Sequence, residues 1–135
     1  MAIAAIDPGR DKCGLAVLAE DGSVLLQRVI ATERLERELA AVADESDLRC
    51  LVLGNGTTCA QAAVRIHTAL PNVEIVFWDE YRTTEEAKKV YWKENPPKGW
   101  RRFIPTTMQV PPCPVDDYVA VILGQRFLDE EERLQ

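Results

Sequence analysis

The sequence predicts an α/β fold with a five-stranded mixed sheet and helices on both faces. Three observations carry this prediction. Three strand-like segments come first and are separated by glycine-containing turns. Two further apolar runs then alternate with helical patterns, an order typical of parallel strands. The run at residues 50–53 is apolar throughout, as expected of a strand buried on both sides.

The first three strands are expected to form an antiparallel meander. They are predicted over residues 3–6, 15–19 and 24–31. The second and third are joined by residues 20–23, where an Asp-Gly pair is a strong hairpin signal. The first strand therefore has the second beside it and ends at Asp7.

Threonines mark the predicted helix starts, because a Thr side chain can accept hydrogen bonds from the free N–H groups of a first turn. Thr32 precedes Leu35, Leu39 and Val42, which share one helical face. The predicted caps of the next two helices are Thr57 or Thr58, and Thr83 or Thr84. The remaining predicted elements are a helix ending at residue 70, a strand over 73–78, a helix ending at residues 95–97, a proline-rich loop over 95–114 and a final helix over 115–128.

Composition limits the class of protein. A length of 135 residues predicts one domain, residues 1–135, with a core that needs no metal or disulfide. Four cysteines without a C-x-x-C pair, and one histidine, argue against a zinc site and favour reduced thiols. No run approaches the roughly 20 apolar residues that span a membrane, and no secretory signal precedes the first strand. We therefore expect a cytoplasmic protein without a membrane partner.

The net charge of −6 argues weakly against a nucleic-acid partner, but its distribution is uneven. Residues 81–105 carry seven Lys and Arg side chains against three Glu. Aromatic residues are interleaved with these bases, a mixture that suits stacking on unpaired bases beside phosphate contacts. Packing of Trp92 and Phe103 beneath the long loop explains the aromatic residues equally well.

Acidic side chains mark the ends of two predicted strands and the start of the last helix. Asp7 ends the first strand, Asp79 and Glu80 follow the fifth, and Asp116 and Asp117 open the final helix. A carboxylate at the tip of a buried strand is costly unless something uses it. Acids converging from three elements can hold Mg²⁺ or Mn²⁺, which activate water and stabilise a leaving oxygen in phosphodiester hydrolysis. Each acid alone is more typical of an ordinary surface position.

Three segments together resemble the motifs of the YqgF/RuvX-like family. They are Asp-Pro-Gly-Arg-Asp-Lys-Cys-Gly-Leu-Ala from Asp7, Asp-Glu-Tyr-Arg-Thr-Thr-Glu-Glu-Ala from Asp79, and Val-Asp-Asp-Tyr-Val-Ala-Val-Ile-Leu from Val115. The resemblance covers nearly the whole chain and implies an RNase H-like fold, similar to the RuvC-type resolvases. It also implies a metal-dependent nuclease that either processes the precursor of 16S ribosomal RNA or resolves Holliday junctions.

The resemblance assigns roles to individual residues. Asp7, Glu80 and Asp116 match the family's catalytic acids and metal ligands for Mg²⁺ or Mn²⁺. Asp117 is a neighbour that the family pattern does not require, although a one-residue shift in the helix start would promote it. Gly9, Lys12 and Gly14 match the turn after the first strand. The expected nucleic-acid-binding residues are Arg10, Lys12, Arg82, Thr83, Lys98, Arg101 and Arg102.

Two alternatives stay open beside the nuclease. The segment Gly54-Asn55-Gly56-Thr57 is similar to the corresponding loop of Tex-type RNA-binding proteins, which favours a non-catalytic nucleic-acid-binding module. An Asp-x-Gly turn also occurs in sugar kinases and actin-like ATPases, but those bind nucleotide between two related lobes, and 135 residues predict one. The substrate could be RNA or branched DNA. Symmetric cutting of a four-way junction requires a homodimer, whereas end-trimming is open to a monomer.

Overall fold

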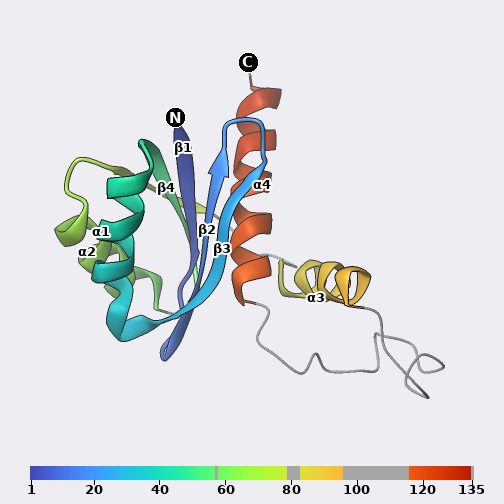
Figure 1. Ribbon diagram of the computed structural model, residues 1–135, viewed down its shortest axis with the longest axis horizontal. Coiled ribbons are helices and arrows are strands. Elements are labelled where there is room, and N and C mark those ends of the chain that lie inside the picture. The colour runs from blue at the N-terminus through green and yellow to red at the C-terminus, as the bar shows by residue number, and fades with distance from the viewer. Residues whose placement is uncertain (57, 79–82, 96–115, 135) are drawn as a thin grey trace.

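A computed structural model describes residues 1–56, 58–78, 83–95 and 116–134, apart from the side chains of residues 83–86, 88 and 116. In chain order the elements are β1 (Ala2–Asp7), β2 (Lys12–Ala19), β3 (Val24–Ala31), the 3-10 turn η1 (Thr32–Arg34), α1 (Leu35–Glu45), β4 (Leu48–Gly54), α2 (Cys59–Ala69), β5 (Glu74–Trp78), α3 (Thr83–Glu94) and α4 (Asp116–Arg133). Their arrangement is shown in Figure 1.

The strands form one mixed sheet in the order β3-β2-β1-β4-β5. β1 pairs antiparallel with β2, which pairs antiparallel with β3. β1 pairs parallel with β4, and β4 pairs parallel with β5. The predicted sheet of three antiparallel strands followed by two parallel ones is therefore confirmed.

Helices cover both faces of this sheet, as predicted (Figure 1). Alternate residues of a strand point to opposite faces, so β1 contributes to two separate cores. On one face Ile6 packs with Leu39 of α1 and Ile66 of α2. On the other face Ile3 and Ala5 lie in a core with residues of α3 and α4. The members of this second core are Ile3, Ala5, Leu18, Cys50, Val52, Ala87, Val119, Ile122, Leu123 and Phe127.

The helix α4 lies close against β1 and β2 because residue 124 is glycine. A Cβ atom at Gly124 would lie 2.3 Å from Leu18 Cδ1 and 3.3 Å from Ala5 Cβ. At its carboxyl-terminal end α4 is held by Arg49, which forms an ion pair with Glu131 at 2.7 Å. None of the described helices is long and apolar enough to cross a lipid bilayer.

Two local predictions were wrong. Thr32 does not cap a helix: it opens η1, α1 begins after Arg34, and neither start has a side-chain cap hydrogen bond. The Thr32 hydroxyl instead donates to the Gly9 carbonyl at 2.9 Å. This acceptor lies 23 positions away in the sequence, so no local pattern predicts the contact. α4 extends to Arg133, five residues past the predicted end at residue 128, because the acidic stretch Asp129–Glu132 continues the helix. The predicted loop lies almost wholly outside the described residues.

Candidate active-site edge

Asp7 is the last residue of β1 and lies at the carboxyl edge of the parallel strands. It pairs with Gly14 of β2 and is partly buried. Because side chains alternate along a strand, Asp7 faces the same side of the sheet as Ile3 and Ala5, the side covered by α4. This places its carboxylate at an edge where ligands of such sheets bind.

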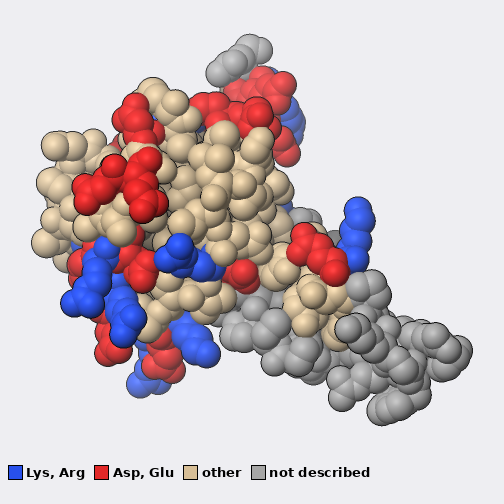
Figure 2. Space-filling view, in the orientation of Figure 1, with Lys and Arg blue, Asp and Glu red and all other residues tan. Residues whose placement is uncertain are grey.

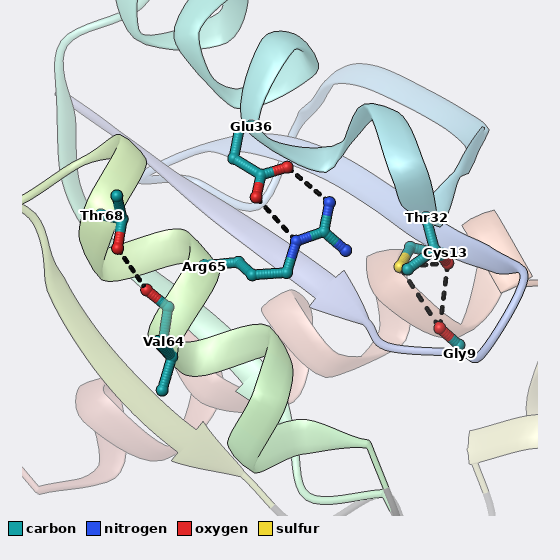
Figure 3. A network of polar contacts seen from close by, with 7 residues as sticks. All are labelled: Gly9, Cys13, Thr32, Glu36, Val64, Arg65 and Thr68. Atoms are coloured by element: carbon teal, nitrogen blue, oxygen red, sulfur yellow. Dashed lines mark hydrogen bonds and ion pairs between the residues drawn. The ribbon is translucent and has the colours of Figure 1, made fainter.

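The turn after Asp7 is fixed by several contacts. A Cβ atom at Gly9 would lie 2.2 Å from the Lys12 carbonyl oxygen, so the turn has room only for glycine there. The Thr32 amide donates to the Asp11 carbonyl at 2.9 Å, and the Thr32 hydroxyl donates to Gly9. Cys13 Sγ lies 3.3 Å from the same hydroxyl oxygen (Figure 3). These contacts connect the turn to the start of η1 and stabilise its conformation.

The carboxyl ends of β4 and β5 lie at the same edge as Asp7. Both strands run parallel to β1, and the Asn55 amide donates to the Trp78 carbonyl at 3.0 Å. β5 ends at Trp78, two positions before Glu80 in the sequence. Glu80 and Arg82 lie outside the described residues, so their predicted roles remain predictions.

The amino-terminal end of α4 also reaches this edge. Gln27 of β3 donates from Nε2 to Asp117 Oδ2 at 3.2 Å, and Gln125 in the middle of α4 donates to the Gly22 carbonyl of the β2–β3 hairpin. Near the carboxyl-terminal end of α4, Glu131 pairs with Arg49 at the start of β4. α4 thus runs antiparallel to β1. Asp116 is its first residue, and the Asp116 side chain lies outside the described part of the chain.

Asp117 has an unusual environment. Its Oδ2 accepts the hydrogen bond from Gln27, whereas its Oδ1 is buried and has no hydrogen-bond partner among the described residues. The sequence singled out Asp117 only as a neighbour of Asp116. Its contact is to a residue 90 positions away in the chain, which no local pattern could reveal.

The start of α4 is anchored to the end of α3. The Tyr118 hydroxyl donates to Glu94 Oε2 at 2.8 Å, and its ring packs edge-on against Tyr91 at 6.0 Å between centroids. Burial, followed by this hydrogen bond to a carboxylate, raises the pKa of Tyr118 to about 12. Trp92 packs edge-on against Tyr91 at 5.1 Å. The aromatic contacts hold the two helices together next to the edge.

The remaining predicted binding residues are only partly described. Arg10 and Lys12 are exposed on the turn that follows Asp7. Thr83 begins α3, but its side chain is not described. The predictions that fall outside the described residues are Arg82, Lys98, Arg101 and Arg102. Within the described residues no group of three or more His, Cys, Asp or Glu side chains could hold a metal ion, and this search included neither Glu80 nor the Asp116 side chain.

Charge is distributed unevenly along the molecule (Figure 2). Near the turn, Arg10 and Arg65 line a shallow depression of about 450 Å³ together with Asp11 and Glu33. At the opposite end, the hairpin and the last turns of α4 line a larger hollow of about 770 Å³. The charged residues of that hollow are Glu20, Asp21, Arg49, Asp129, Glu131 and Glu132. Two basic and two acidic side chains line the depression near the turn, whereas one basic and five acidic side chains line the opposite hollow, so the described lining near the turn is the less acidic.

Comparison with solved structures identifies the fold. No protein-family model matches the sequence, and no curated protein matches it either. RuvC of Thermus thermophilus is similar with a TM-score of 0.60 and 16% identity, over 93% of this chain and 91% of that chain. The T. thermophilus RuvC in complex with a Holliday junction substrate also has a TM-score of 0.60, at 14% identity, over 98% and 96% of the two chains.

A ROK family protein from Streptococcus pneumoniae matches less well, with a TM-score of 0.45 over 70% of this chain and 39% of that one. The RuvC matches extend over nearly the full length of both proteins. Together with the strand order β3-β2-β1-β4-β5 and the helices against both faces, they show that this chain has an RNase H-like fold.

Proposed function

We propose that this protein is a metal-dependent nuclease that hydrolyses phosphodiester bonds in structured nucleic acid. The observation that carries the proposal is the position of Asp7. It lies at the edge of the sheet where β4 and β5 end and where α4 begins. The fold is shared with RuvC, one structure of which contains a Holliday junction substrate. The proposed metal ligands are Asp7, Glu80 and Asp116.

The two described carboxylates at this edge, Asp7 and Asp117, are suitable ligands for a divalent cation, and Glu80 and Asp116 would complete the set. The donors at this edge are carboxylates, which Mg²⁺ and Mn²⁺ prefer. The buried Oδ1 of Asp117 has no hydrogen-bond donor among the described residues, and a cation at this edge would compensate its charge. A bound Mg²⁺ or Mn²⁺ supplies charge stabilisation for the transition state and a water molecule of lowered pKa.

The chain's own residues contribute positioning and substrate contacts. The turn held by Gly9 and Thr32 fixes the backbone at the end of β1, from which the Asp7 side chain extends. Arg10 and Lys12, exposed beside it, contact the phosphates of the substrate in this proposal. The further predicted contacts come from Arg82, Thr83, Lys98, Arg101 and Arg102. Precursor 16S ribosomal RNA and a four-way DNA junction are the two candidate substrates, the second requiring a homodimer.

A second candidate is a non-catalytic nucleic-acid-binding module. The Gly54-Asn55-Gly56 segment favours it through its similarity to the Tex-type loop. In such a module Asp7 has no cation to hold, and binding to nucleic acid is independent of Mn²⁺. The two candidates therefore differ in metal binding as well as in cleavage.

The test compares cleavage of structured RNA and of a four-way DNA junction in Mn²⁺ by the wild type, Asp7→Asn and Asp129→Asn. Asp129 is exposed near the far end of α4, so its variant is a matched control for the loss of one carboxylate. The nuclease predicts cleavage that Asp7→Asn reduces by more than about 10- to 100-fold, the loss caused by changing residues that only support a metal ligand, and that Asp129→Asn leaves intact.

A folded wild-type protein that cleaves neither substrate contradicts the nuclease. If such a protein also binds no Mn²⁺, and its affinity for nucleic acid is equal in the wild type and in Asp7→Asn, the binding module is supported instead. Sedimentation of the protein with and without the junction decides between monomer and homodimer.

A further inference from the structure

We propose that Asp117 is an additional metal-facing acid of this site and that Gln27 is the residue that positions it. This inference rests on the proposed function and extends it to two residues that the sequence motifs do not require. It is carried by the Gln27–Asp117 hydrogen bond, by the unpartnered oxygen of Asp117 and by the sheet register beneath them.

The register places Gln27 on the same face of the sheet as Asp7. Gln27 pairs with Ala16 of β2, and Ala16 pairs with Ala5 of β1. Residues paired across strands point to the same face, and Ala5 belongs to the core beneath α4. Asp7 lies two residues beyond Ala5, so it points to this face as well.

The positions between Gln27 and Asp7 carry small residues. Ala5 and Ala16 lie in the row of Gln27, and Gly14 lies in the row of Asp7. Larger side chains at these positions would occupy the surface between β1 and β3 beneath the start of α4. With alanine and glycine there, the first turn of the helix can approach the sheet, and Asp117 makes its contact with Gln27 at 3.2 Å.

The two carboxylate oxygens of Asp117 have different hydrogen-bonding environments. Oδ2 receives a donor from Gln27, while Oδ1 is buried with no hydrogen-bond partner among the described residues. A buried charged oxygen without a donor is expensive in a folded protein. The same arrangement is common in metal ligands, where a neighbouring donor orients the carboxylate and the other oxygen binds the ion.

The orientation of Asp117 is reinforced through the next residue. Tyr118 is fixed to Glu94 by a 2.8 Å hydrogen bond and to Tyr91 by an edge-on ring contact. These contacts restrict rotation of the first turn of α4 about its axis. Asp117 is therefore held on the sheet side of the helix by Gln27 from below and by α3 from the side.

The purely structural alternative is that Asp117 stabilises the start of α4. An acid in the first turn of a helix interacts favourably with the free N–H groups and the helix dipole. That role predicts a loss of stability when the charge is removed and no change in metal affinity. The metal-facing role predicts the opposite pair of results.

The experiment measures Mn²⁺ affinity by isothermal titration calorimetry, and the metal-free melting temperature, for the wild type, Asp7→Asn, Asp117→Asn, Gln27→Leu and Asp129→Asn. We expect Asp117→Asn and Gln27→Leu each to weaken Mn²⁺ binding about 10- to 100-fold, the range seen when oriented ligands or their supporting residues are changed. We expect the metal-free melting temperature of Asp117→Asn to equal or exceed that of the wild type, because the variant removes the charge from a carboxylate whose buried Oδ1 has no hydrogen-bond donor among the described residues. Asp129→Asn, on the same helix, serves as the control and should bind as the wild type does.

The outcomes separate this inference from the proposed function. If the wild type binds Mn²⁺ and Asp7→Asn does not, while Asp117→Asn and Gln27→Leu bind as the wild type does, the inference alone is overturned. If the wild type binds no Mn²⁺, the proposed function and the inference fall together. If Asp117→Asn does not fold, Gln27→Leu decides the matter alone, since it leaves the charge at the helix start in place.

Discussion

Gly124 of α4 and Leu18 of β2 are packed so closely that a single methyl group would not fit between them. A Cβ atom at Gly124 would lie 2.3 Å from Leu18 Cδ1, and Leu18 is fully buried. This contact sets the distance between α4 and the sheet. It therefore also sets where the start of α4 meets the edge that carries Asp7.

Gly124→Ala should destabilise the protein by about 1–2 kcal/mol, because overpacking typically costs about 1–3 kcal/mol and alanine returns up to about 1 kcal/mol of helix propensity. Urea unfolding measures the change. Leu18→Val removes part of the clash, so the double variant should lose less stability than the sum of the two single variants. Strict additivity, or a Gly124→Ala protein as stable as the wild type, would contradict the packing argument.

Gly9→Ala should open the turn after Asp7. The added Cβ would lie 2.2 Å from the Lys12 carbonyl oxygen, a backbone atom that cannot move without distorting the turn. We expect a loss of more than about 1 kcal/mol, since incompatible replacements of glycine exceed the usual gain from reduced chain entropy. Gly22→Asn is the control: Gly22 has φ +91° with open space around it, and asparagine tolerates that conformation. An equal loss of stability in the two variants would contradict this argument, because it would show that replacing any turn glycine has the same effect.

The ion pair between Glu36 of α1 and Arg65 of α2 makes stability depend on acid pH (Figure 3). Hydrogen bonds from Arg65 lower the pKa of Glu36 from 4.5 to about 2. Because the folded pKa is depressed, the stabilisation is complete above pH 4.5 and is lost as the pH falls from there toward 2. The Glu36 side chain is 44% exposed, so the coupling should be only about 0.2–1 kcal/mol.

A double-mutant cycle of Glu36→Gln and Arg65→Met measures that coupling at pH 7 and at intervals below pH 4.5. A coupling energy that stays constant over this interval would show that the pair does not titrate as described. Raising the salt concentration at pH 7 should weaken the coupling, because a half-exposed pair is screened.

The sequence predicted the sheet well because its signals are local. The apolar run at residues 50–53 lies within β4, and the predicted third strand coincides with β3. The Asp-Gly pair predicted the hairpin between the second and third strands, and the structure confirms it, with Gly22 at a positive φ that few residues tolerate. Periodicity and turn chemistry suffice for such features, since each depends on residues that are neighbours in the chain.

The contacts that shape the candidate site could not be predicted in the same way. Thr32 is a residue type that often caps helices, yet its hydroxyl donates a hydrogen bond to the Gly9 carbonyl in the β1–β2 turn. The sequence motif matches Asp116 and does not require Asp117, whose distinguishing contact is with Gln27 on β3. Both depend on tertiary contacts between segments far apart in the sequence, where no spacing rule applies.

Arg49 links three elements at the end of the molecule opposite Asp7. It donates to Glu20 beside the hairpin at 2.7 Å and makes two hydrogen bonds to Glu131 of α4, at 3.0 and 2.7 Å. Lysine cannot reproduce this forked geometry. Arg49→Lys should therefore cost about 1 kcal/mol, near the upper end for partly exposed pairs.

Hydrogen exchange in the last two turns of α4 should accelerate in Arg49→Lys, because Glu131 loses the fork that ties it to β4. Exchange at the start of the same helix should not change, since Tyr118 and Gly124 hold that part independently. Mn²⁺ affinity should also equal that of the wild type. A matching loss of metal affinity would mean that α4 moves as one rigid rod, and that the position of Asp117 depends on the far end of the helix as much as on Gln27.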